Sequence, residues 1–454
     1  MSFAITSISP IDGRYSRQTE SLKPVFSEFG LIKNRVKVEI LWLIALSNDK
    51  EIKELPKFSK QALKYLNNLF LDFSEKDAKA VKEIESKTNH DVKAVEYWLR
   101  NQLKKKKLNK VNEFIHFSLT SEDVNNLAYA LMLKEGLSTI IVPSIKKIST
   151  ILKANSKKFA ALPMLSRTHG QTASPTTLGK EFGNINSRIE RQITQLKNQE
   201  ILGKINGAVG NFNAHVSAYP KKNWPAFSKS FISSLKLTYN PMTTQIEPHD
   251  FIAEIFQNVS RINTILIDLN RDIWGYISLG YFKQKIVKGE IGSSTMPHKV
   301  NPIDFENSEG NLGLSNAVLN HLAEKLPLSR WQRDLTDSTV LRNIGVGFSY
   351  GLIAYNSCIK GLNKLEVNKS IINEELNQSW EVLAEPIQTV MRKNGIENSY
   401  EKLKDITRGK GKISADQIHH FIRNLKISKK DKAYLLELTP QSYIGVAQQL
   451  AKKN

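Results

Sequence analysis

Apolar residues recur at alternating steps of three and four along several stretches of the chain, which is the period of an amphipathic helix. Each stretch predicts a long helix with one apolar stripe, and several such helices in succession indicate a bundle. Sustained period-two alternation and strand–helix alternation are absent from the sequence, which argues against a parallel α/β sheet. The expected fold class is therefore all-α. The longest series are Ile141, Ile145, Ile148 and Leu152; Leu178, Phe182, Ile185, Ile189, Ile193 and Leu196; and Ile252, Ile255, Val259, Ile262, Leu266, Leu269 and Ile273.

Polar and glycine-containing breaks divide these helical stretches. They lie at residues 104–112, 166–175, 203–220, 288–302 and 361–368. We expect a helical N-terminal domain at 1–111, a central helical bundle at 112–363 and a helical C-terminal domain at 364–454. Long loops inside a bundle are uncommon unless they carry function, so the segment 288–302 is the first place to look for chemistry.

Composition narrows the class of protein. Of 454 residues, 40% are hydrophobic and 24% charged, which is ordinary for a globular protein that buries a sizeable core. No run of eighteen apolar residues and no secretory signal pattern is found, so we expect a cytoplasmic protein without a membrane partner. The single cysteine, Cys358, fits a reducing compartment.

The net charge of +21 leaves three kinds of partner open: nucleic acid, an acidic membrane surface, or a polyanionic small molecule. Much of the excess is lysine in short runs, such as residues 104–107 and 429–430, which are typical of solvated surface. No RNA-binding pattern with interleaved aromatic residues accompanies them. The charge therefore favours an anionic ligand without identifying it, and no nucleic-acid partner is expected.

Two segments carry side chains suited to catalysis. Residues 292–302 read GSSTMPHKVNP and place two hydroxyls, an imidazole, an ammonium and an amide together with no carboxylate. By composition alone this is a flexible connection, but the density of polar functions suits a loop that closes over an anion. Residues 166–171 read SRTHGQ, in which His169 is suited to proton transfer near neutral pH and Gly170 allows close approach of a ligand. A lone histidine is more often structural.

Three further segments indicate binding or capping. Thr120, with Asp123 three residues later, predicts a helix N-cap, and such a helix start also attracts carboxylate or phosphate. Residues 89–91, Asn-His-Asp, are typical of a polar turn. Arg333 and Arg342 are suited to bidentate contacts with carboxylate or phosphate, and the alternative is a set of surface ion pairs with Asp334 and Asp337.

Familiar cofactor and metal patterns are not found. The glycine-rich segment 203–210 lacks the GxGxxG spacing and a preceding strand, and no Walker loop is present. The nine histidines contain no HExxH pattern, and the pair at 419–420 has no further ligand nearby. We therefore expect no metal and no cofactor.

The sequence GSSTMPHKVNP resembles the signature loop of the fumarase/aspartase superfamily. Within this loop, the residue before Lys299 is His298, which resembles the adenylosuccinate lyases. Fumarase and aspartase usually have glycine at this position, and argininosuccinate lyase usually has glutamine. The resemblance to the bacterial form of these enzymes extends over nearly the whole chain. Its other segments are DGRY at 12–15, TNHDVK at 88–93, TSED at 120–123, SRTHGQ at 166–171, NGAVGN at 206–211 and the arginine segment at 329–342.

This resemblance implies an all-α chain of three domains whose long central bundle forms a homotetramer, with active sites drawn from three chains. It implies β-elimination of fumarate from adenylosuccinate, giving AMP, and from SAICAR, giving AICAR, in purine nucleotide biosynthesis. It also implies three catalytic residues: Ser293 as the base, His169 as the acid, and Glu306 as the carboxylate that pairs with this histidine. No cofactor is implied.

The resemblance further implies a set of substrate-binding residues. Thr120, Ser121, Lys299 and Asn301 would hold succinyl carboxylates. The remaining ones would hold the nucleotide end or line the loop. They are Arg14, Tyr15, Asn89, His90, Asp91, Gln245, Ser294, Asn307, Arg333, Ser338, Thr339 and Arg342. Many relatives have arginine at the positions of Val300 and Asn307, so other residues must share the binding of phosphate here.

Three alternatives compete with this hypothesis. Another lyase of the superfamily, such as argininosuccinate lyase, is disfavoured by His298 and by residues 89–91. A non-catalytic protein on the same scaffold is disfavoured by the presence of Ser293, His169 and Glu306. A nucleic-acid-binding protein rests on charge alone, and such binding fades steeply with salt.

Overall fold

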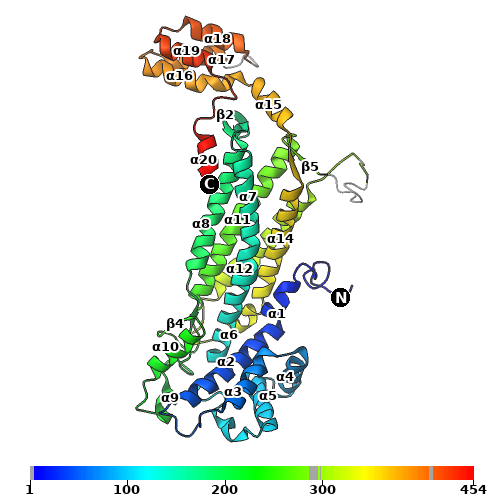
Figure 1. Ribbon diagram of the computed structural model, residues 1–454, viewed down its shortest axis with the longest axis vertical. Helices are drawn as coiled ribbons and strands as arrows, with labels where there is room; N and C mark the ends of the chain where they lie inside the picture. Colours follow the sequence, from blue (N-terminus) through cyan, green and yellow to red (C-terminus); the bar gives the residue numbers. More distant parts are fainter. Residues whose placement is uncertain (1–4, 286–294, 297, 408–412, 454) are drawn as a thin grey trace. The chain divides into compact units, whose positions relative to one another are not determined.

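The structure is a computed structural model that describes residues 5–285, 295–296, 298–407 and 413–453 (Figure 1). The chain divides into two compact units. The first comprises Met1–Ile145, Gln192–Thr264 and Gly310–Asn356, and the second Lys146–Arg191, Ile265–Glu309 and Ser357–Asn454. The division falls inside five helices: α7 (Val142–Lys158), α8 (Leu178–Asn198), α11 (Asp250–Ser278), α12 (Ile303–Lys325) and α14 (Ile344–Lys364).

The first unit is built mainly from helices, and its N-terminal helices α2 to α5 lie together (Figure 1). Its helices are α1 (Lys23–Phe26), α2 (Glu28–Asn48), α3 (Lys60–Leu71), α4 (Glu75–Thr88), α5 (Asp91–Lys105), α6 (Ser121–Gly136), α9 (Asn213–Ala218), α10 (Trp224–Ser234) and α13 (Thr336–Leu341), with the short helices η1 (Glu20–Leu22) and η2 (Asn109–Phe114) and the π-helical turn η3 (Leu137–Ile141). Strands β3 (Leu202–Gly203) and β4 (Thr238–Tyr239) form a parallel pair.

The second unit contains the C-terminal helices, of which α16 to α19 gather into one group (Figure 1). Its elements are α15 (Lys369–Asn377), η4 (Trp380–Leu383), α16 (Ala384–Lys393), α17 (Ser399–Thr407), α18 (Ala415–Asn424), α19 (Lys429–Glu437) and α20 (Ala447–Lys453). Two antiparallel pairs complete it, β1 (Pro163–Thr168) with β2 (Gln171–Thr177) and β5 (Phe282–Gln284) with β6 (Leu365–Val367). The mostly helical fold predicted from the sequence is confirmed.

The three predicted apolar stripes correspond to α7 with the end of the preceding turn η3, to α8 and to α11, and every member of each series is buried. Helix α6 differs from them because it is buried on nearly all faces, from Glu122 to Leu133. Its first turn therefore carries polar groups into the interior, where each needs a partner. This constraint shapes the candidate site.

The polar break expected at residues 166–175 is a β-hairpin rather than an irregular loop. Strands β1 and β2 pair in an antiparallel register in which Arg167 lies opposite Thr172. The turn is formed by His169 and Gly170, both with positive φ (53° and 74°), which matches the two-residue turns that connect twisted strands. The strands are short and mostly polar, so they show no clear alternation of apolar and polar residues from which a hairpin could be predicted.

One stretch, Ser121–Lys158, has the length and composition of a membrane span, but 61% of its most apolar window is buried within the protein. Burial of this kind is typical of a core helix. By length and composition, this is the one such stretch among the residues that the structure describes.

Cys358 on α14 is fully buried, and burial raises the pKa of its thiol to about 12 from an ordinary value of 9.0. Because the thiolate is the reactive form, we expect the native thiol to react with a disulfide reagent on the order of 1,000-fold more slowly than an unfolded one at neutral pH. Absorbance after mixing with Ellman's reagent, in buffer and in guanidinium chloride, measures both rates. Equal rates in the two solutions would contradict the burial.

Candidate active site

The N-terminus of α6 carries the first predicted binding residues. Thr120 is the N-cap, and its backbone N–H donates to Oδ2 of Asp123 at 2.9 Å, which confirms the predicted capping box. Thr120 and Ser121 are half-buried. The first N–H groups of a helix have no intrahelical acceptor, and together with the helix dipole they attract a carboxylate or phosphate.

The carboxylate of Asp123 also holds a second segment in place. Asp123 and Lys204 are both fully buried, and Nζ of Lys204 lies 2.9 Å from Oδ1 of Asp123. The same carboxylate accepts hydrogen bonds from the backbone N–H groups of Asn206 and Gly207, each at 3.0 Å. The glycine-containing segment that begins at Lys204 is therefore fixed against the start of α6.

Residues Asn89, His90 and Asp91 form the junction between α4 and α5, as expected of a polar turn. Asn89 ends α4 in the left-handed region (φ 51°), and His90 is the N-cap of α5. Nδ1 of His90 accepts from the backbone N–H of Lys93 at 3.2 Å. This leaves Nε2 of the exposed ring to carry the proton.

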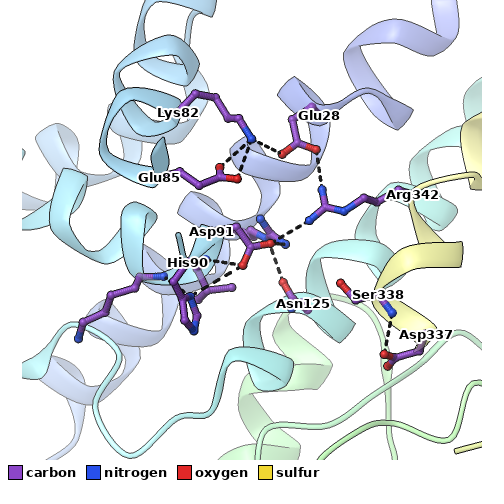
Figure 2. A network of polar contacts seen from close by, with 12 residues as sticks. Glu28, Lys82, Glu85, His90, Asp91, Asn125, Asp337, Ser338 and Arg342 are labelled. Atoms are coloured by element: carbon purple, nitrogen blue, oxygen red, sulfur yellow. Dashed lines mark hydrogen bonds and ion pairs between the residues drawn. The ribbon is translucent and has the colours of Figure 1, made fainter. Parts of the chain in front are cut away.

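Asp91 joins two arginines that come from distant parts of the sequence (Figure 2). Its Oδ2 accepts from Nη2 of Arg35 at 2.7 Å and from Nη2 of Arg342 at 3.0 Å. Burial raises the pKa of Asp91, but Arg35 and Arg342 outweigh burial, and the pKa lies below its ordinary value. Asp91 is therefore charged at neutral pH and orients both guanidinium groups.

Arg333 occupies a similar position between polar groups. Its Nη1 donates to Oε1 of Gln245 at 3.2 Å, and its Nη2 donates to Oε1 of Glu122 at 2.9 Å. The ion pair with Asp337 predicted as an alternative is present but longer, at 3.8 Å, whereas Asp334 pairs with Arg330. Arg333 is thus held by three side chains.

Helix α13 carries Ser338 and Thr339 beside this arginine. Ser338 is half-buried, and its backbone N–H donates to Oδ1 of Asp337 at 2.6 Å. Thr339 is exposed. Asp337 also lies 3.5 Å from Nε2 of the buried His249, so this end of the site rests on a buried histidine–aspartate contact.

The contacts of Arg333 and Arg342 belong to one continuous network. Asn125 connects them: its Nδ2 donates to Glu122 at 2.6 Å, and its Oδ1 accepts from Nε of Arg35 at 2.8 Å. The network thereby passes from Gln245 and Arg333 through α6 to Arg35, Asp91 and Arg342. Four predicted site residues, separated by up to 251 positions in the chain, share this network.

Arg14 and Tyr15 lie in the irregular segment before α1. The backbone N–H of Tyr15 donates to the carbonyl of Pro10 at 2.8 Å, which closes a turn. The guanidinium carbon of the exposed Arg14 lies 6.0 Å from the centre of the Tyr15 ring. These two predicted residues belong to the same unit as the network.

The second unit holds the predicted acid. His169 lies at the exposed tip of the β1–β2 hairpin. Close to this tip, Arg167 donates to the hydroxyl of Tyr281 at 3.0 Å and pairs with Glu375 on α15. Ser174 on β2 donates to Glu385 on α16. The described contacts of a single chain give His169 no hydrogen bond.

Helix α12 carries Glu306 and Asn307 in its first turns. Oε1 of Glu306 accepts from Nε1 of Trp274 at 3.2 Å, and Oδ1 of Asn307 accepts from the hydroxyl of Ser357 at 2.7 Å. The predicted pair between Glu306 and His169 is not among the contacts described within one chain, so it stays a prediction.

The signature loop is described only in part. Ser293 and Ser294 lie outside the described residues. Lys299 is exposed, and its backbone N–H donates to the carbonyl of Met296 at 3.0 Å, while Asn301 is half-buried just before α12.

The predicted site residues therefore form two groups, one in each unit. The first unit holds the predicted residues of five sequence segments, several of which share the network, and the second holds His169, Lys299, Asn301, Glu306 and Asn307. Among the residues that the structure describes, no cluster of three or more histidine, cysteine, aspartate or glutamate side chains is placed to hold a metal ion.

Three residues that contact the predicted site residues were missed from the sequence: Arg35, Asn125 and Glu28, whose Oε2 accepts from Nη1 of Arg342. A signal for Arg35 was present, because it lies on the buried stripe of α2, where Ile32, Val36 and Trp42 are apolar. A charged residue on such a stripe is rarely buried unless it is paired. Glu28 and Asn125 carry no comparable signal.

Comparisons with known proteins show the family to which the chain belongs. A family model described as lyase matches residues 13–318, more than half of the chain. The fold is similar to that of a fumarate lyase from Mesorhizobium sp. (TM-score 0.75, 16% identity, covering 96% of this chain and 97% of that one). It is also similar to 3-carboxy-cis,cis-muconate lactonizing enzyme from Pseudomonas putida (TM-score 0.72, 19% identity, 96% of each chain). The family model, which covers more than half of the chain, shows that the protein is a lyase, and the fold is consistent with it.

A second family model, described as adenylosuccinate lyase C-terminal, matches residues 329–444. The adenylosuccinate lyase of Vibrio cholerae is 58% identical over 452 residues, which cover 99% of both chains. That of Escherichia coli is 58% identical over 445 residues, covering 98% of this chain and 97% of the other. The chain belongs to the adenylosuccinate lyase family.

Replacing Lys204 by methionine tests the buried ion pair. The variant leaves the charge of Asp123 uncompensated in the interior, so we expect a loss of about 3–5 kcal/mol in the free energy of unfolding. Chemical denaturation followed by circular dichroism measures it. The matched control, Lys221→Met, removes an exposed lysine and should change stability by less than about 0.5 kcal/mol. A loss in Lys204→Met no larger than in the control would contradict the structural role of the pair.

Proposed function

We propose that the protein splits adenylosuccinate into AMP and fumarate, and SAICAR into AICAR and fumarate, in purine nucleotide biosynthesis. The observation that carries the proposal is the network that joins Gln245, Arg333, Asp91 and Arg342, supported by full-length relatives with this activity in their names. A set of oriented arginines beside a helix N-terminus suits a substrate that carries carboxylates and a phosphate.

The reaction is a β-elimination. Ser293 takes a proton from the carbon next to one succinyl carboxylate, and the electrons of that C–H bond form the new double bond of fumarate. The C–N bond breaks, and its electron pair stays on the nitrogen of the purine or imidazole, which His169 protonates. A serine acts as a base only where its alkoxide is stabilised, which is the role we assign to Lys299 and the loop N–H groups.

Binding divides between the two ends of the substrate. Thr120 and Ser121 at the start of α6, with Lys299 and Asn301, hold the succinyl carboxylates. The phosphate and ribose are held by Arg14, Tyr15, Arg333, Ser338 and Arg342. Gln245 contacts the substrate beside Arg333. His90 belongs to the substrate-binding segment 89–91, in which Asp91 accepts a hydrogen bond from the base or ribose. Because Ser357 donates to Asn307, that side chain contributes to helix packing as well.

The exposed position of His169 supports a site shared between chains. An acid catalyst needs a partner to orient it, and Glu306 on another chain would supply one in a homotetramer. A monomer should therefore be inactive. The cytoplasmic location and the division into domains at 1–111, 112–363 and 364–454 complete the proposal.

Substrate identity is tested by fumarate release. The purified protein should release fumarate, read by its ultraviolet absorbance, from adenylosuccinate and SAICAR, because the arginine network suits their phosphate groups. Argininosuccinate and aspartate lack a phosphate and should give none. Release from argininosuccinate alone would contradict the proposal in favour of the sister enzyme.

The catalytic assignments are tested by Ser293→Ala and His169→Ala. Each should lower kcat by about 10²- to 10⁴-fold with little change in thermal stability, since each removes one proton-transfer group. His420→Ala, which removes an exposed C-terminal imidazole, is the matched control and should keep full activity. Near-normal turnover in either test variant would remove that residue from the mechanism.

A further inference from the structure

A cavity of about 350 Å³ lies in the first unit, beside the irregular N-terminal segment. Glu28 and Arg342 line it, together with Asp12, Lys23 and Ser349. Arg342 is thus accessible from a space large enough for a phosphate-bearing group, and its chemistry suits one. Under the proposed function, this wall receives the phosphate end of the substrate.

Two carboxylates already engage Arg342. Its Nη1 donates to Oε2 of Glu28 at 2.8 Å, and its Nη2 donates to Oδ2 of Asp91 at 3.0 Å. Asp91 is also held by the buried Arg35, whereas the side chain of Glu28 is 38% exposed to solvent. Of the two carboxylates, Glu28 is the one that an incoming anion can displace.

Glu28 has a second cation within reach. Its Oε1 lies 3.3 Å from Nζ of Lys82 on α4, and Lys82 also pairs with Glu85 at 2.8 Å (Figure 2). The three cations Arg35, Arg342 and Lys82 therefore balance the three carboxylates Glu28, Asp91 and Glu85. An added phosphate disturbs this balance unless one carboxylate changes partner.

We infer that Glu28 is a positioning residue that exchanges Arg342 for Lys82 when the phosphate of the substrate binds. With the cavity empty, Glu28 holds the guanidinium toward the cavity wall and neutralises it. When phosphate arrives, it takes the place of Oε2 on Nη1, and the displaced carboxylate remains paired with Lys82. Lys82 thus strengthens phosphate binding without touching the substrate, and Glu28 weakens it. This inference rests on the proposed role of Arg342.

The exchange predicts opposite effects for its two members. Calorimetry with AMP measures affinity without turnover. Lys82→Met should raise the Kd for AMP by about two- to fivefold, because Glu28 then has only Arg342 as a partner. Glu28→Gln should lower it by a similar factor, because the competing charge is removed. Adenosine, which lacks the phosphate, should bind both variants as it binds the unmodified protein.

Two controls separate exchange from other effects. Lys82→Arg should restore the affinity of the unmodified protein. Lys79→Met removes the same charge from α4 at an exposed position outside the network and should leave the Kd unchanged. The inference would be overturned if Lys79→Met raised the Kd for AMP as much as Lys82→Met does. It would also be overturned if Glu28→Gln and Lys82→Met changed this Kd in the same direction. Failure of the proposed function is a different outcome, because it would appear as no release of fumarate by the unmodified protein.

Discussion

The buried contact between Asp123 and Lys204 is the constraint on which the first unit's site depends. Helix α6 starts inside the protein, so the carboxylate at its third position has no water to solvate it. Lys204 supplies the compensating charge, and the backbone N–H groups of Thr120, Asn206 and Gly207 supply the remaining donors. One carboxylate therefore fixes both the start of α6 and the segment packed against it.

The same logic extends outward along α6. Glu122 and Asn125 are also buried, and the groups that satisfy them are Arg333 and Arg35. These contacts continue to Asp91 and Arg342, where the network reaches solvent and a cavity. The arginines at the surface are thus oriented by charges that the interior requires to be paired.

The sequence predicted the long helices well, because their stripes have a clear period and no competing pattern. It predicted the cap at Thr120 and the turn at Asn89–Asp91 for the same reason, since each is decided by neighbouring residues. It missed the hairpin that carries His169, whose strands are short and polar. It also missed Glu28 and Asn125, because partners 314 and 90 positions away are decided by tertiary packing and leave no local signal.

The exposed position of His169, for which no hydrogen bond is described within one chain, supports the central proposal, that the acid and base of one site come from different chains of a homotetramer. The most direct measurement mixes two inactive proteins, His169→Ala and Ser293→Ala, under conditions that let subunits exchange, and follows fumarate release from adenylosuccinate. The account predicts that activity returns, because mixed tetramers contain sites with both residues intact. A mixture that exchanges subunits and stays inactive would contradict it.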